Sequence, residues 1–237
     1  FVSSDQKELE QQYLDELMAY KIEGLIVLSH TFPSEKLASY HIPIVAIERE
    51  AEHICSVNTD NYMGALQATS LLIRDNCDIL IHINVNVKKS APAYDRIRAF
   101  QETCEEHHVP YDIDLDVEGN SYHEILDVIR VIFDKIEAKY PDQKKGIFLA
   151  NDTYANMFLN LIFQKYGTFP STYEIVGFDN SPIASEAILP ITTVGQQIDV
   201  IAKTAMDLLV RQMDEQKKRA PKPLGKPIHK QITPILI

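Results

Sequence analysis

Three polar residues, Glu48, Asn151 and Asp179, each stand at or just beyond the end of a short apolar run. A carboxylate accepts hydrogen bonds, and an asparagine amide both donates and accepts them. In open parallel sheets, ligands bind at the carboxyl ends of the strands. If these apolar runs are such strands, the three side chains are candidates for hydrogen bonding to a polar small molecule.

No catalytic, nucleotide or metal motif accompanies these residues. The sequence contains no G-x-G-x-x-G, G-x-x-x-x-G-K-[ST], G-x-S-x-G or H-E-x-x-H. The adjacent His107 and His108 point apart on a helix, and Cys104 beside them lacks an orienting third group. The acidic alternation at 111–118 lacks the glycine and the closing glutamate of a calcium loop. We therefore expect no catalytic residue, no metal site and no cofactor.

The composition is that of a globular chain rather than of a nucleic-acid-binding or membrane protein. The 237 residues carry 23 Lys and Arg against 34 Asp and Glu, a net charge of −11, which disfavours general binding to phosphate backbones. No apolar run approaches the ~20 residues that a membrane span needs. Three scattered cysteines predict reduced thiols and a cytoplasmic location.

Short apolar runs alternate with segments of helical period along the chain. Strands are predicted at 24–28, 44–47, 79–83, 146–149 and 173–178, with a half-exposed or edge strand within 111–118. Helices are predicted at 8–20, 34–40, 62–73, 94–106, 121–138, 154–166 and 200–216. This alternation with short connections predicts an α/β fold with parallel sheets covered by helices on both faces.

Five separated segments together resemble the effector-binding core of the lactose-repressor/galactose-repressor family of bacterial transcription regulators. The family patterns are V-x-x-D-N-x-x-G-A, R-x-x-G-F, A-N-D-x-x-A, V-V-G-[FY]-D-[DN] and P-x-L-T-T-V. The matching segments, in the same order, are Val57–Ala65, Arg96–Phe100, Ala150–Ala155, Ile175–Asn180 and Pro190–Val194. Ala99 replaces the usual glycine of the second pattern.

The resemblance implies two doubly wound parallel-sheet subdomains with a ligand cleft between them, a periplasmic-binding-protein-like fold of type I. It places the first subdomain at 1–77 plus 198–225 and the second at 78–197 plus 226–237. It also implies that the helix-turn-helix domain that binds DNA, and the first strand and helix of the core, are absent from this chain. Residues 1–5 then correspond to the second strand of the family.

The resemblance also implies which side chains meet the ligand. They are Arg96, Asn151, Asp179, Glu48, Tyr94, Ser121 and Ile198. A surface salt bridge is the alternative for Arg96, and a role at the start of the next helix is the alternative for Asp179. Asn151 is free to bind ligand if Asp152 caps the following helix. Relatives often have aromatic residues where this chain has Ser121 and Ile198, so Tyr94 or Phe178 is the alternative stacking group.

The function implied is a sensor of a small carbohydrate that controls DNA binding by the absent domain. Operator DNA is then contacted only through that domain. Family members dimerise through the first subdomain, and the apolar positions of the early helices, including Leu14, Leu17 and Met18, are candidates for that contact. A periplasmic sugar-binding protein of the ribose class is the alternative, and an enzyme on the same scaffold is the least favoured.

Overall fold

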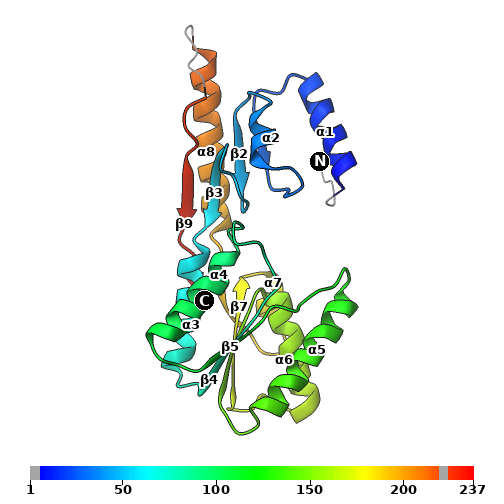
Figure 1. Ribbon diagram of the computed structural model, residues 1–237, viewed down its shortest axis with the longest axis vertical. Coiled ribbons are helices and arrows are strands. Elements are labelled where there is room, and N and C mark those ends of the chain that lie inside the picture. The colour runs from blue at the N-terminus through cyan, green and yellow to red at the C-terminus, as the bar shows by residue number, and fades with distance from the viewer. Residues whose placement is uncertain (1–5, 219–223) are drawn as a thin grey trace. The chain divides into compact units, whose positions relative to one another are not determined.

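The computed structural model describes residues 6–218 and 224–237, so the strand predicted at 1–5 lies outside the described residues. The chain divides into two compact units (Figure 1). Unit 1 comprises residues 1–59, 90–92 and 197–232, and unit 2 comprises residues 60–89, 93–196 and 233–237. Each unit has its own sheet and its own apolar core, and each is described by itself.

Unit 1 contains a parallel four-stranded sheet of order β1-β2-β3-β9. The strands are β1 (Leu25–Val27), β2 (Ile44–Ile47), β3 (Cys55–Thr59) and β9 (His229–Ile232). Three helices cover it, α1 (Lys7–Ala19), α2 (Ser34–Ala38) and α8 (Ile198–Lys217). Alternate residues of β2 serve the two faces: Ile44 packs in the core that includes residues of α1 and α2, whereas Val45 packs with α8.

Unit 2 contains a six-stranded sheet of order β10-β8-β7-β6-β4-β5. Its strands are β4 (Ile79–Ile83), β5 (Tyr111–Asp114), β6 (Lys145–Leu149), β7 (Tyr173–Asp179), β8 (Thr192–Gly195) and β10 (Ile235–Leu236). All neighbours are parallel except β10, which pairs antiparallel with β8. From β4 the chain moves outward to β5, and from β6 it moves the other way through β7 to β8. The strand order therefore reverses between β4 and β6, the kind of position where open α/β sheets bind ligands.

Helices cover both faces of the unit 2 sheet. One core packs against α3 (Asn61–Arg74) and α4 (Tyr94–Glu106), and the other packs against α5 (Tyr122–Lys139) and α6 (Asp152–Tyr166). The two pairs are seen on either side of the strands in Figure 1. A short helix, α7 (Pro182–Glu186), follows β7. The predicted α/β architecture with parallel sheets is therefore present in both units.

The division into units differs from the predicted subdomain boundaries mainly at two segments, and residues 90–92 and 197 also group with unit 1. Residues 60–77 group with unit 2, because α3 packs against α4 and the core beneath it. Residues 226–232 group with unit 1, because β9 pairs with β3. The predicted helices and strands agree with the structure to within a few residues. The elements that were not predicted are β3, β8, β9, β10 and α7. Among the described residues, no helix is long and apolar enough to cross a membrane.

A cluster of charged and phenolic groups lies at the amino end of the unit 2 sheet. The Glu137 carboxylate of α5 accepts hydrogen bonds from Lys165 Nζ at 2.5 Å and from the hydroxyls of Tyr166 and Tyr173. Lys145, buried at the start of β6, has its Nζ 3.7 Å from Glu137 Oε1. Burial alone would raise the pKa of Glu137, but the three donors outweigh it and lower that pKa to about 2.

This pKa predicts how the stability of unit 2 depends on pH. A carboxyl whose pKa is lower in the folded than in the unfolded chain stabilises the fold above its ordinary pKa of 4.5. That contribution is lost as the pH falls from 4.5 towards 2. We expect Glu137→Gln to lower the free energy of unfolding at pH 7 and to change it much less at pH 3. Urea unfolding of both proteins at the two pH values measures this, and an equal loss at both would contradict it.

Candidate functional site

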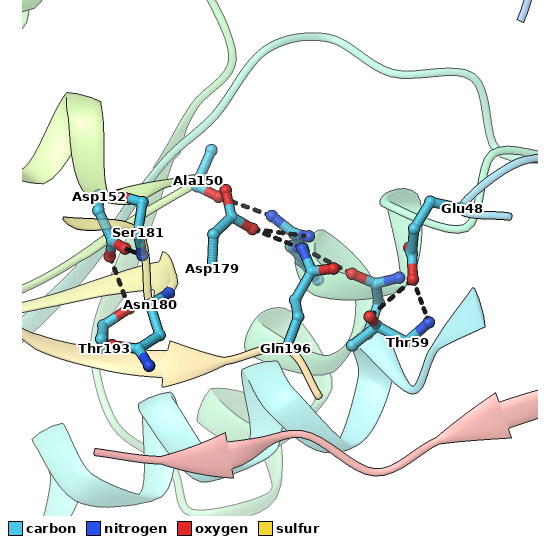
Figure 2. A network of polar contacts seen from close by, with 11 residues as sticks. Glu48, Thr59, Ala150, Asp152, Asp179, Asn180, Ser181, Thr193 and Gln196 are labelled. Atoms are coloured by element: carbon cyan, nitrogen blue, oxygen red, sulfur yellow. Dashed lines mark hydrogen bonds and ion pairs between the residues drawn. The ribbon is translucent and has the colours of Figure 1, made fainter. Parts of the chain in front are cut away.

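Arg96, in the first turn of α4, is the centre of a polar network at the carboxyl edge of the unit 2 sheet. Figure 2 labels three members of this network, Ala150, Asp179 and Gln196. The Nε of Arg96 donates to Asn61 Oδ1 at 2.7 Å, and its Nη1 donates to the main-chain oxygen of Ala150, also at 2.7 Å. Asn61 begins α3, and Ala150 follows β6. The guanidinium thus joins two helices to the end of a central strand, beside the point where the strand order reverses. We call this set, with Phe178, Asp179 and Gln196, the Arg96 network.

The arginine is held between an aromatic ring and a carboxylate, both from β7. Its Cζ lies 3.5 Å from the centroid of the Phe178 ring, a cation–π contact. Its Nη2 lies 3.7 Å from Asp179 Oδ1, which also accepts from Gln196 Nε2 at 2.6 Å. The Arg96 side chain is 11% exposed and that of Asp179 37%. The carboxylate is therefore the member of this ion pair that solvent, or a ligand, reaches more easily.

The sequence around Asn61 explains why these groups meet. Asp60 caps α3, because its Oδ1 accepts from the Met63 amide at 2.9 Å, and this sets Asn61 as the first helical residue. One turn later, a Cβ at Gly64 would lie 2.8 Å from the Phe178 ring. Only glycine leaves room for the ring on which Arg96 lies. The D-N-x-x-G segment therefore contributes to the Arg96 network in two ways: Asn61 accepts a hydrogen bond from Arg96, and Gly64 leaves room for the Phe178 ring.

The main chain at the end of β7 adopts a conformation that non-glycine residues rarely adopt. Asp179 has φ 101° and Asn180 has φ 52°. Such angles cost about 1–3 kcal/mol each and persist where the surroundings hold them. The Asn180 amide donates to Thr193 Oγ1 at 3.3 Å, and Gln196 holds the Asp179 carboxylate. Strain held in this way at a polar strand end is a common feature of ligand sites.

A buried carboxylate, that of Asp152, also supports this strand end. It accepts from Thr193 Oγ1 at 2.5 Å and from the Ser181 amide at 2.7 Å, so it ties the start of α6 to β8 and α7. Burial raises the pKa of Asp152, and the hydrogen bonds from Thr193 and Ser181 partly offset the rise. Because Asp152 is fully buried, its role is structural.

Asn151, not Asp152, caps α6, which corrects the interpretation made from the sequence. Asn151 Oδ1 accepts from the Tyr154 amide at 2.8 Å, and its extended main chain is that of an N-cap. A ligand contact by Asn151 would therefore use its amide nitrogen. Asn151 directly follows Ala150, so it still lies at the same edge of the sheet as Arg96.

The other predicted site residues occupy different places. Tyr94 is the first residue of α4, in the same turn as Arg96. Ser121 caps α5, with its Oγ accepting from the Glu124 amide at 3.3 Å. Phe178, the alternative stacking group, is fully buried beneath Arg96 and presents no ring to solvent.

Glu48 and Ile198 belong to unit 1. Glu48 follows β2 with φ 52°, and its Oε1 accepts from the Thr59 hydroxyl at 2.7 Å and from the Thr59 amide. It therefore lies at the carboxyl edge of its own sheet, as predicted. Ile198 is the first residue of α8 and is 65% exposed.

Sequence reasoning missed a buried pair at the end of β4. The Phe148 carbonyl accepts from His82 Nδ1 at 2.9 Å, so His82 Nε2 accepts from Asn84 Nδ2 at 3.0 Å. Burial lowers the pKa of His82 to about 3, with a further lowering from the charge of Arg96, so the ring is neutral at physiological pH. The signal was present in the sequence as a polar His82 within an otherwise apolar strand and a polar Asn84 directly after it.

Among residues 6–218 and 224–237, no group of three or more histidine, cysteine or carboxylate side chains is arranged to hold a metal ion. The arrangement described above offers hydrogen-bond donors and acceptors rather than a nucleophile or a base–nucleophile pair.

Comparisons with known proteins agree on the family and the fold. A family model described as a periplasmic binding protein-like domain matches residues 72–230. The ribose operon repressor of Halalkalibacterium halodurans is 28% identical over 214 residues, which cover 90% of this chain and 62% of the repressor. The sucrose operon repressor of Streptococcus mutans is 27% identical over 215 residues, which cover 90% of this chain and 64% of that protein. The chain thus spans less than two thirds of these relatives.

Two solved structures show the same fold. The crystal structure of a periplasmic binding protein/LacI transcriptional regulator from Alkaliphilus metalliredigens, complexed with D-xylulofuranose, has a TM-score of 0.78 at 23% identity, covering 99% of this chain and 83% of that one. That of the transcription regulator CcpA of Lactococcus lactis has a TM-score of 0.79 at 20% identity, covering 100% and 84%. The predicted fold class and the predicted resemblance are confirmed.

The contact between Gly177 and Asp152 generates a prediction about stability. A Cβ at Gly177 would lie 2.3 Å from Asp152 Oδ1, a buried atom that is already hydrogen-bonded. We expect Gly177→Ala to lower the free energy of unfolding by about 1–3 kcal/mol, the scale of overpacking a core. Urea denaturation measures this. Gly225→Ala is the control, because a Cβ there meets nothing within 4 Å. Equal losses in the two variants would contradict the packing argument.

Proposed function

Because the chain belongs to the periplasmic binding protein-like domain family, we propose that it is the effector-sensing part of a transcription regulator whose effector is a small carbohydrate. The relatives named above are repressors of ribose and sucrose operons, which supports this proposal. The same names favour a regulator over a periplasmic sugar-binding protein.

The Arg96 network is the observation that carries the proposal. A sugar is recognised through hydroxyls that both donate and accept hydrogen bonds, so its site needs acceptors and donors side by side. A half-exposed Asp179 carboxylate beside a buried guanidinium supplies both. Asn151 on unit 2, and Glu48 on unit 1, are the further polar groups that we assign to effector binding. We also keep three further residues as proposed effector contacts, although no hydrogen bond described above supports them: Tyr94, Ser121 and Ile198.

Effector binding must then change the affinity for DNA. We assign operator binding to a separate helix-turn-helix domain, because the net charge of −11 makes this chain a poor partner for phosphate backbones. A ligand shifts such an equilibrium only by the difference in its affinity for the two conformations. In this proposal the protein acts in the cytoplasm as a regulator and has no catalytic role.

Substitutions at Asp179 and Arg96 test the effector site. Asp179→Asn keeps the shape but removes a charged acceptor, and Arg96→Ala removes the guanidinium. We expect each to weaken sugar binding by about 1.5–3 kcal/mol, or roughly 10- to 150-fold. Calorimetry against pentoses, hexoses, disaccharides, phosphosugars and purines first identifies the effector of the unaltered protein, and the variants are then titrated with it.

The control is Asp112→Asn, which also removes an ion-paired carboxylate from unit 2. Asp112 lies on β5, and its carboxylate is 2.7 Å from Lys139 Nζ. A structural role for Asp179 and Arg96 would lower the melting temperature while leaving the affinity of the folded protein unchanged. Unchanged affinity in both variants would overturn the assignment of the effector site.

We also propose that the protein forms a homodimer through unit 1. Met206 and Val210, one turn apart on α8, are 50% and 44% exposed, which supports an apolar contact surface on this unit. Leu14 of α1, by contrast, packs in the core of unit 1 and is not available. Sedimentation at tens of micromolar, about the range where weak dimers form, should show a dimer that Met206→Glu disrupts. A strict monomer would contradict this.

A further inference from the structure

A cavity of about 370 Å³ lies at the amino edge of the unit 1 sheet, where the strands begin. The first residues of two strands, Ile44 of β2 and Cys55 of β3, line it together with Gln212 of α8. Small-molecule sites occupy about 300–1,000 Å³, so this volume suits a small ligand. Glu48 follows the other end of β2, about 13 Å along the strand. We call this space the amino-edge cavity, and it is distinct from the proposed effector site.

The walls of the amino-edge cavity are largely apolar. Ile42, Ile44, Ile54 and Leu224 all line it. Ile44 and Ile54 are buried, whereas Leu224 is 39% exposed. A ligand that covers this leucine gains free energy from the apolar surface that it removes from water. A suitable ligand therefore has an apolar body.

Two N–H groups beside the cavity donate to a weak acceptor, the sulfur of Cys55. Gln212 Nε2 donates to Cys55 Sγ at 3.1 Å, and the main-chain amide of Ile228 donates to the same sulfur at 3.2 Å. A thiol sulfur accepts hydrogen bonds weakly, whereas a carboxylate oxygen accepts them strongly. If the Gln212 amide turned from the sulfur to a carboxylate, a weak hydrogen bond would be replaced by a charge-assisted one.

Two histidines add further donors to the amino-edge cavity. His41 and His53 both line it, and both are exposed. Ser34 Oγ accepts from the His53 amide at 3.3 Å, which leaves the hydroxyl proton for His53 Nδ1, also at 3.3 Å. His53 Nε2 is then the ring nitrogen that carries a proton and can donate to a ligand. Among the described residues that line the cavity, none is Asp or Glu, so no carboxylate of the lining repels an acidic ligand.

We propose that the amino-edge cavity is a second ligand site, which takes a small carboxylic acid with an apolar body. The body lies against Ile44, Ile54 and Leu224, and the carboxylate accepts from Gln212 Nε2 and His53 Nε2. These residues all belong to unit 1, and none of them is assigned to the effector. The inference therefore does not depend on the proposed function.

The probes are 3-phenylpropionate and 3-phenylpropanol, which share an apolar body and differ in the carboxylate. Calorimetry on the intact chain should show the acid binding about tenfold or more tighter than the alcohol, the scale of a hydrogen bond to a charged group. Amide hydrogen exchange should slow in residues 53–55 and 212–216 when the acid is bound. No binding of the acid at millimolar concentration, equal affinities for the two probes, or unchanged exchange would each overturn the inference.

Gln212→Glu tests the carboxylate contact, because it places a negative charge where a donor stood. We expect it to weaken binding of the acid about tenfold or more and to change binding of the alcohol much less. Gln164→Glu is the matched control, because it adds the same charge at an exposed position of α6 in unit 2. Wild-type affinity for the acid in Gln212→Glu, or an equal loss in both variants, would contradict the assignment.

Asp179→Asn distinguishes the amino-edge cavity from the proposed effector site. It should leave the affinity for 3-phenylpropionate unchanged, because Asp179 belongs to unit 2. Loss of acid binding in this variant would overturn the inference, whereas failure of every sugar to bind would overturn only the proposed function. If Gln212→Glu does not fold, Ala38→Leu replaces it, because the larger side chain fills part of the cavity that Ala38 lines. That variant should weaken both probes, and unchanged affinities would overturn the site.

Discussion

Burying the guanidinium of Arg96 is the constraint on which the carboxyl edge of unit 2 depends. A charge removed from water must be surrounded by fixed polar groups, and no single loop supplies enough of them. Here α3 supplies an amide oxygen, the end of β6 a carbonyl, and β7 both a ring and a carboxylate. Segments distant in sequence must therefore be in register before the arginine is satisfied, which makes this edge of the sheet a cooperative unit.

Unit 1 also buries an arginine, Arg49, but different polar groups surround its guanidinium. Arg49 is also buried after a strand of a parallel sheet, but its partners are mainly main-chain carbonyls of neighbouring loops, with Glu10 as the nearby opposite charge. Main-chain partners fix the path of a loop, whereas side-chain partners fix individual functional groups. Arg49 accordingly orders a loop, and Arg96 orders a set of polar side chains.

The fold was largely predictable, because apolar runs and helical periodicity reflect burial directly. The positions of Arg96 and Asp179 were predictable from their motifs, but the role of Gly64 was not, since a missing side chain reveals nothing about the ring it accommodates. The choice between Asn151 and Asp152 as cap failed for a similar reason: both residue types cap helices, and only the contact with Thr193 shows that Asp152 is committed elsewhere. Arg49 was missed because a charged residue after a strand is usually solvated.

The neutral His82 ring has a consequence for how this protein responds to its surroundings. An imidazole close enough to Arg96 for their charges to interact would ordinarily exchange protons near neutrality. With a pKa of about 3 it stays neutral at any pH a living cell maintains. Occupancy of the proposed effector site is therefore not linked to proton uptake through this ring. Acidity within the physiological range therefore does not change the charge at that position.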